Sequence, residues 1–432
     1  MQQLSNWKSD SAQVYNDIWG YAANGREYAI VGSNWGTHFV DITNPAVPTE
    51  IAAYAGAGQA VTGYNSSWRD FKTYGHYVYG VADVGAHTLQ IFDMSQAPDT
   101  VFKVYDSNAL STSAHTVAQE NDRLYLVANR RDGAFWPIDI VSVSDPLNPT
   151  LIGTIGAPWF TEMHALHVRN DTLYCSAGYS GLYIIDATNA AAPSIVSTIT
   201  NYPSSGYNHT AWTSGDRKTM IMTDEVPASL PVKVFDISDI SNPTLLTTFD
   251  NGTLGTPHNT FMIGDIAILS YYMDGVQVYD LQNPSNPVRI GYFDTFPDND
   301  STQTSYTSPT PYNGNWGVYP YLPSGNIIAS DKVYGLYVIS PPYTITAAQK
   351  PDMLGIKAQV YPNPAEGNFT VKLAEVTPDT ELTLYNSLGV QVYNAKAAGT
   401  ENRIVTSQLS AGLYTLRISN KTQSAVQKVV LR

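Results

Sequence analysis

The sequence contains a single cysteine, Cys175, among its 432 residues, so neither an intramolecular disulfide nor a CxxC metal site can form. Charged residues are scarce at 14%, against an average of about 25%. Basic residues are the rarer kind, and the formal net charge is −14. This balance argues against binding to nucleic acid or to an anionic membrane, because both need clustered positive charge. No apolar run is long enough to predict a transmembrane segment.

Turn-forming and aromatic residues are abundant instead, with 31 Gly, 26 Pro and 30 Tyr. This mixture favours short strands joined by tight turns over helical bundles. Composition changes near residue 350: residues 353–432 carry a net charge of +3, whereas the first 352 residues carry −17 and all eight His. We therefore predict two domains, at 1–343 and 355–432, with a linker at 344–354.

A repeated signature organises the larger domain. A short apolar run, usually an Asp, and then a Pro recur seven times at intervals of 44 to 59 residues. Each Asp precedes an Asn/Pro turn, where its side chain is expected to bond the backbone; these residues are Asp41, Asp93, Asp186, Asp236 and Asp280. Other short strands surround the signature, giving four strands per unit, which is the spacing of a β-propeller blade.

The two ends of the repeat region complement one another. The last unit ends at Pro341-Pro342 without a fourth strand, and residues 3–8 form a strand without a blade. Exchange of this strand would close the ring and remove exposed sheet edges. We predict an all-β protein, a seven-bladed β-propeller followed by a small Ig-like β-sandwich. A β-helix or a sandwich is the alternative for the large domain, but the four-strand periodicity favours the propeller.

A second signature lies about 25 residues upstream of the first and marks the strand that lines the central channel. It predicts a channel ring made of Asp17, Asp70, His115, His164, His209, His258 and Trp316. Two interpretations stay open. Each polar side chain could bond the backbone of the next blade. Alternatively, His115, His164, His209 and His258, with Asp17 or Asp70, could bind a divalent transition metal, as in an oxidase or oxygenase.

Three further features are weaker candidates. The run Asp298-Asn299-Asp300-Ser301 resembles part of a Ca²⁺ loop but lacks its Gly and distal Glu, so a solvated loop is the favoured interpretation. Cys175 alternates with apolar residues and is expected to be a buried small hydrophobe. Several Trp and Tyr near turns would suit glycan or protein binding if they are exposed, although most are expected to pack between blades.

Residues 355–432 read as alternating strands separated by turns, as in a small β-sandwich. The segment resembles the type A C-terminal sorting domain of type IX secretion substrates in Bacteroidetes. The resemblance rests on several short motifs, and its signal residues are Tyr361, Pro362, Asn363, Pro364, Gly389, Gly412, Tyr414 and Lys428. It implies recognition by the type IX secretion machinery, export across the outer membrane, and attachment to the cell surface or release.

The large domain resembles the LVIVD-repeat propellers of the choice-of-anchor B family. The resemblance is carried by segments 16–21, 25–29, 36–41, 68–70 and 316–331. It implies a secreted propeller with no established activity, from which a signal peptide has been removed. We therefore expect a binding or scaffold module with an unknown surface protein or glycan as its ligand. A metalloenzyme using the histidine ring and an adhesin are the alternative functions.

Overall fold

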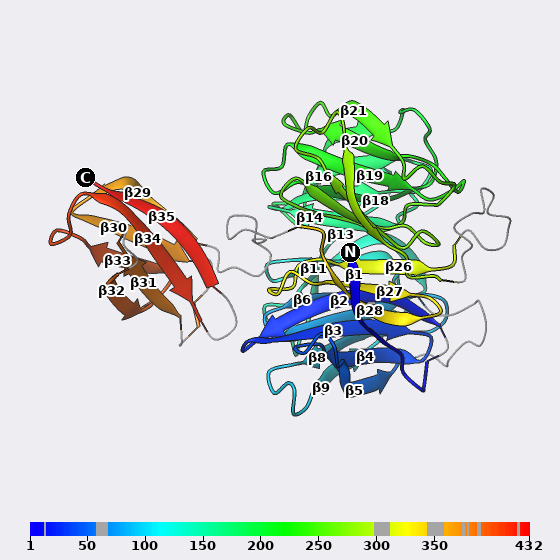
Figure 1. Cartoon of the computed structure of the whole chain (residues 1–432), viewed down its shortest axis with the longest axis horizontal. Coiled ribbons are helices and arrows are strands. Elements are labelled where there is room, and N and C mark those ends of the chain that lie inside the picture. Colours follow the sequence, from blue (N-terminus) through cyan, green and yellow to red (C-terminus); the bar gives the residue numbers. More distant parts are fainter. Residues whose placement is uncertain are drawn as a thin grey trace. The chain divides into compact units, whose positions relative to one another are not determined.

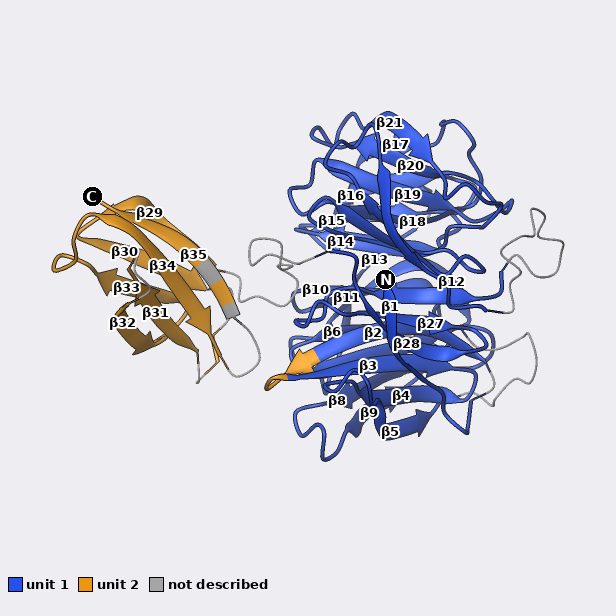
Figure 2. Cartoon of the chain, viewed as in Figure 1, with its two compact units in different colours: residues 1–21, 26–349 blue, residues 22–25, 350–432 orange. Residues whose placement is uncertain are grey.

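The computed structural model describes residues 1–12, 14–57, 68–156, 158–297, 312–343, 358–373, 376–377, 380–386, 390–420 and 424–432. Two compact units divide the chain: residues 1–21 and 26–349 form the first, and residues 22–25 and 350–432 form the second (Figure 2). The predicted linker at 344–354 lies outside the described residues and stays a prediction. Within the described ranges, no helix is long and apolar enough to cross a membrane.

Seven four-stranded antiparallel sheets make up the first unit (Figure 1), and each is one blade of a propeller. Blades 1 to 3 contain β2 (Tyr15–Ala23), β3 (Arg26–Ser33), β4 (Gly36–Asp41), β5 (Thr49–Ala55); β6 (Arg69–Tyr74), β7 (Tyr77–Ala82), β8 (Leu89–Asp93), β9 (Phe102–Ser107); and β10 (Thr116–Glu120), β11 (Arg123–Arg131), β12 (Ala134–Ser142), β13 (Thr150–Ile155). Blades 4 to 6 contain β14 (Ala165–Arg169), β15 (Thr172–Ser176), β16 (Leu182–Asp186), β17 (Ser194–Ile199); β18 (Asn208–Thr213), β19 (Thr219–Asp224), β20 (Val232–Asp236), β21 (Thr244–Phe249); and β22 (Thr260–Ile263), β23 (Ile266–Ser270), β24 (Val276–Asp280), β25 (Val288–Phe293).

Blade 7 combines the two ends of the repeat region. It consists of β26 (Asn315–Tyr319), β27 (Ile327–Asp331), β28 (Gly335–Ser340) and the N-terminal strand β1 (Gln2–Trp7). The register pairs Gln2 with Ser340 and Trp7 with Leu336, so β1 supplies the outer strand that the last repeat lacks. The predicted seven blades and their closure by strand exchange are confirmed.

Burial explains why the strands of one blade differ in sequence. The second and third strands pack against neighbouring blades on both faces and read as continuous apolar runs, whereas outer strands such as β5 and β9 are half exposed. One apolar cluster joins blades 3 and 4 through Tyr125, Ile140, Leu173 and Ile185. Cys175 lies in the same cluster, and its burial confirms that it acts as a small hydrophobe.

The repeated Asp residues end the third strands with Asx turns. Asp41 Oδ1 accepts a hydrogen bond from the backbone N–H of Thr43 at 2.9 Å, and Asp93 Oδ1 accepts one from Ser95 at 2.7 Å. The same i to i+2 bond recurs at Asp186, Asp236 and Asp280. The expectation that these carboxylates determine turns is therefore confirmed.

The C-terminal unit contains two sheets that enclose one apolar core. Its strands are β29 (Ala358–Glu366), β30 (Asn368–Leu373), β31 (Glu381–Tyr385), β32 (Gln391–Lys396), β33 (Glu401–Val405), β34 (Gly412–Ser419) and β35 (Ser424–Leu431). They follow the order β32-β31-β34-β35 and β29-β30-β33, joined at the single parallel pair Ala365–Leu431. Phe369, Leu384 and Leu416 are fully buried between them, as the predicted β-sandwich requires.

Candidate functional site

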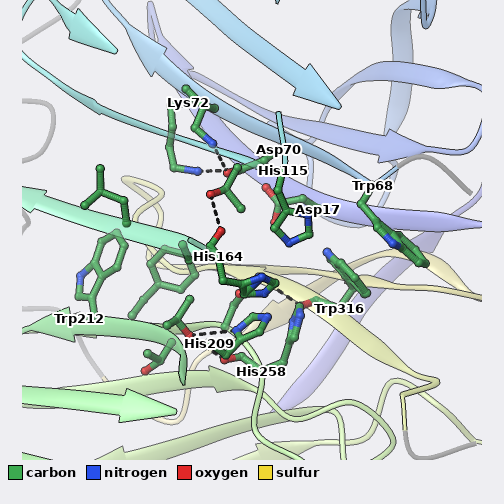
Figure 3. A pocket seen from close by; sticks show the side chains of 18 of the residues that line it. Asp17, Trp68, Asp70, Lys72, His115, His164, His209, Trp212, His258 and Trp316 are labelled. Atoms are coloured by element: carbon green, nitrogen blue, oxygen red, sulfur yellow. Dashed lines mark hydrogen bonds and ion pairs between the residues drawn. The ribbon is translucent and has the colours of Figure 1, made fainter. Parts of the chain in front are cut away.

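The innermost strand of each blade brings one predicted ring residue to the channel. Asp17, Asp70, His209 and Trp316 lie within β2, β6, β18 and β26, and His115, His164 and His258 lie one or two residues before β10, β14 and β22. All seven line one cavity with a volume of about 70 Å³ (Figure 3). Because equivalent positions of successive blades face a common axis, residues up to 299 positions apart in the chain meet at this cavity.

The four histidines form a continuous arc of imidazoles that contact one another at tilted angles. Ring centroids are 4.3 Å apart between His115 and His164, 4.1 Å between His164 and His209, and 4.2 Å between His209 and His258. The arc continues through Trp316, 4.6 Å from His258, to Trp68, whose indole is parallel to that of Trp316 at 4.4 Å. The site therefore has one wall of imidazoles and one of indoles.

The two aspartates at the other side of the ring have partners of their own. Asp70 accepts hydrogen bonds from Lys72 Nζ at 2.7 Å and from the backbone N–H of Val117 in blade 3 at 2.7 Å. Burial and the adjacent Asp70 carboxylate hold the pKa of Asp17 well above its usual value. Asp70 thus joins two blades, as the architectural interpretation expects, and no imidazole among the described residues hydrogen-bonds to either aspartate.

The carboxylates that do reach the imidazoles come from the second strands and were missed in the sequence. Asp83, directly after β7, lies with its Oδ2 2.5 Å from His115 Nδ1. Glu225, directly after β19, lies with its Oε2 3.8 Å from His209 Nε2 and accepts a hydrogen bond from Tyr272 at 2.5 Å. Both follow the last residue of a second strand, and this shared repeat position is the signal that could have identified them.

Strand β19 holds Glu225 in place through the buried residue that precedes it. Asp224 is fully buried and accepts hydrogen bonds from Lys233 Nζ at 2.6 Å and from the Tyr202 hydroxyl at 3.0 Å. The pairing compensates the buried charges of Asp224 and Lys233, which alone would be strongly destabilising. The backbone from which the Glu225 side chain extends is therefore held in place.

Burial and neighbouring groups shift the pKa values of the four imidazoles in different directions. Burial lowers the pKa of His115, but the hydrogen bond and charge of Asp83 outweigh burial and raise the pKa above its ordinary value. Burial and the neighbouring imidazoles hold the pKa values of His164 and His258 well below the usual range, and burial lowers that of His209 to about 4. At neutral pH the arc therefore has three neutral rings, whose nitrogen lone pairs are available to a ligand.

An aromatic layer lies deeper in the channel. Phe261 contacts Trp212 at 4.6 Å and Trp19 at 6.2 Å between centroids, and Lys72 Nζ lies 4.3 Å from the Trp19 ring. Thr260 lines the same cavity, is 1% exposed, and its hydroxyl has no hydrogen-bond partner within the described structure. A buried hydroxyl of this kind requires a partner from a ligand or water.

Tyrosines surround the imidazole arc on the other side. Tyr207 lies 5.2 Å from His164, and Tyr179, 68% exposed, packs on Tyr207 at 5.1 Å. On the neighbouring blades, Tyr272 contacts His258 at 4.6 Å and Tyr312 at 5.4 Å. We call these four tyrosines, together with Trp68 and Trp316, the aromatic collar.

The predicted sorting-signal residues belong to the C-terminal unit. Asn363 Nδ2 donates to the Lys428 carbonyl at 2.7 Å, and Asn363 Oδ1 accepts from the Val430 N–H at 2.9 Å. The Tyr414 hydroxyl donates to the Ser410 carbonyl at 2.8 Å, and Tyr361 is 44% exposed. Gly389 and the Asp298–Ser301 run lie outside the described residues.

Fold and site together define a β-propeller with a cavity in its channel and a separate C-terminal β-sandwich. Residues 359–432 match the secretion system C-terminal sorting domain, and residues 25–55 match the LVIVD repeat. The chain therefore carries an LVIVD repeat and a C-terminal sorting domain, and the sorting domain indicates export by the type IX secretion system to the cell surface or the medium. The choice-of-anchor B assignment of the whole large domain stays a prediction.

Solved structures share the fold at low sequence identity. The periplasmic gluconolactonase PpgL of Pseudomonas aeruginosa matches with a TM-score of 0.51 and 10% identity, over 97% of this chain and all of that one. The β-propeller domain of Cps50 (Swd1) from Myceliophteria thermophila matches with a TM-score of 0.50 and 10% identity, over 79% of this chain and 99% of that one.

A type IX secretion surface component, PorZ of Porphyromonas gingivalis, matches with a TM-score of 0.43 and 10% identity over 94% of this chain. The chain spans 64% of the length of PorZ. No curated protein sequence matches the chain. At these identities the similar structures support the fold alone.

Proposed function

We propose that the protein is an exported binding module whose ligand-binding site is the channel cavity with its aromatic collar. The observation that carries the proposal is the convergence of neutral imidazoles, parallel indoles and an unpartnered hydroxyl at one cavity. Ligand sites in proteins characteristically combine aromatic walls with a few convergent polar groups.

The chemistry of the site favours a glycan as the ligand. Aromatic faces bury the apolar faces of sugar rings, and imidazole, carboxylate and hydroxyl groups pair with sugar hydroxyls. The cavity of about 70 Å³ holds only a small group. A terminal sugar would therefore stack on the collar and insert one polar substituent between the imidazoles. The net charge of −17 on the first 352 residues favours a neutral glycan over an acidic one.

Glycan-array binding of the purified full chain tests this proposal. We expect Tyr179→Ala and Trp68→Ala each to weaken binding at least about tenfold, since each removes a stacking face of the collar. Tyr292→Ala is the matched control, because Tyr292 is 60% exposed on the outer strand β25 and is not part of the collar. Binding that is lost equally in the control, or absent from the wild type, would overturn the proposal.

A further inference from the structure

Three donor groups, two of which line the cavity, lie close enough to share one ion. The nitrogens of His164 and His209 and a carboxylate oxygen of Glu225 all lie within 4.8 Å of one another. Among the described residues, no other group of three such side chains meets this criterion. The ion site that the structure supports is therefore narrower than the four-histidine ring and includes a glutamate from a second strand.

The spacing fits a metal ion after a small adjustment. Metal–nitrogen and metal–oxygen bonds of about 2.0–2.2 Å place two ligand atoms about 3.4 Å apart in a tetrahedron and about 4.2 Å apart when opposite. His209 Nε2 and Glu225 Oε2, at 3.8 Å, already lie in this range. The remaining separations, at most 4.8 Å, require only a small adjustment of the His164 ring.

The ring nitrogens of His164 and His209 have few competing hydrogen bonds, and the Glu225 carboxylate is oriented toward His209. No described side chain hydrogen-bonds a ring nitrogen of His164. The His209 ring has a long contact of 3.4 Å between Nδ1 and the Thr210 hydroxyl and a hydrogen bond with the backbone of His258. The Tyr272 hydroxyl fixes Glu225 Oε1 at 2.5 Å and leaves Oε2 directed to His209. A hydrogen bond of this kind behind a ligating carboxylate is usual in metal sites.

We propose that His164, His209 and Glu225 form a site for one divalent transition-metal ion of the Zn²⁺ class. Two imidazoles and a carboxylate suit such an ion and leave a fourth position open to the cavity. His115 and His258 are not ligands in this arrangement, and Tyr272 is a positioning residue. The inference goes beyond glycan recognition and does not depend on it, because the metal alone is the ligand.

Titration of the metal-free full chain with Co²⁺, followed by visible absorbance, tests this site. We expect one equivalent to bind, and Glu225→Gln, His209→Gln and His164→Gln each to weaken binding at least about 100-fold. Tyr272→Phe should weaken it about 10–100-fold. His115→Gln is the matched control within the arc and should retain binding within about threefold.

Two results would overturn the inference. One is the absence of stoichiometric binding by the wild type. The other is a loss in His115→Gln or His258→Gln as large as that in Glu225→Gln, which would restore the four-histidine ring. Thermal unfolding of each variant without metal shows whether it is folded, and a folded wild type should gain stability from Co²⁺ that folded Glu225→Gln does not. Glycan binding by metal-free protein separates this result from that of the proposed function.

Discussion

Buried polar residues of the propeller differ in what compensates their burial. Asp224 and Lys233 are both fully buried and neutralise one another at 2.6 Å. His167, in the inner strand β14, contacts the Thr213 hydroxyl at 3.0 Å and the rings of Trp212 at 4.1 Å and Tyr174 at 5.6 Å. Burial, with a smaller contribution from Arg169, lowers the pKa of His167 to about 3, so the native imidazole is neutral. Because this imidazole is buried in its neutral form, acid that protonates it would lower the stability of the native protein.

We predict that His167 makes stability fall with acidification. The unfolded chain protonates this histidine below pH about 6.5, whereas the native protein resists protonation down to about pH 3. Its contribution is therefore complete above pH 6.5 and is lost as pH falls toward 3. His167→Gln should reduce the slope of unfolding free energy against pH by about 1 kcal/mol per pH unit between pH 6 and 4, measured by urea unfolding.

Thr213→Val is the control for this measurement. It removes the hydrogen-bond partner of His167 but keeps the imidazole, so it should lower stability while the slope stays. A slope that is unchanged in His167→Gln would contradict the prediction.

Some polar side chains hydrogen-bond to backbone groups and so determine how neighbouring elements are connected. The Asx turns after the third strands do so in the propeller. In the sorting domain, Asn363 of β29 bonds the backbone of β35 at both Lys428 and Val430. The carboxamide therefore joins the two sheets close to their only parallel pair, Ala365–Leu431. This gives a structural reason for an Asn between the two prolines of the sorting signal.

We predict that Asn363→Ala loosens the end of the sorting domain. Both hydrogen bonds are lost, and because water can reach them the cost is about 1 kcal/mol. Cleavage of the domain in the full chain by dilute protease should accelerate about fivefold, followed by mass spectrometry. Asn394→Ala, which loses only a bond to Thr383 within one hairpin, should cleave more slowly than Asn363→Ala. Equal rates in the two variants would remove the special role of Asn363.

Closure of the ring is a property of the whole propeller. Strand β1 pairs with β28 at five positions, and its Trp7 ring also lies 5.7 Å from that of His38 in blade 1. The N-terminal strand therefore links the last blade to the first. Without it, β28 would present an unpaired edge.

We predict that deletion of residues 1–8 destabilises the propeller by about 5 kcal/mol, at about 1 kcal/mol for each of the strand hydrogen bonds lost. Calorimetry should show a lower melting temperature, and size-exclusion chromatography should show association through the open edge. Deletion of residues 355–432 is the control and should leave the propeller transition in place. A truncated chain that melts with the wild type would show that the ring is closed without β1.

The repeat made much of the architecture predictable. Equivalent positions in seven similar units must occupy equivalent places around an axis. The repeat period and the turn residues were therefore enough to predict the blades and the exchanged strand. They also predicted that His115 and His164 face one channel. The sorting domain was recognisable because its short motifs follow one another along the chain.

The contacts of each ring residue depended on tertiary structure instead. Asp83 meets His115 across 32 residues, Tyr272 meets Glu225 across 47, and His258 meets the Trp316 carbonyl across 58. Such pairs form only when blades close at a given angle and side chains settle in given rotamers, and a repeat pattern contains neither quantity. The sequence by itself determined which residues face the channel, whereas packing between blades decided which of them touch, because those contacts join strands that the repeat leaves independent.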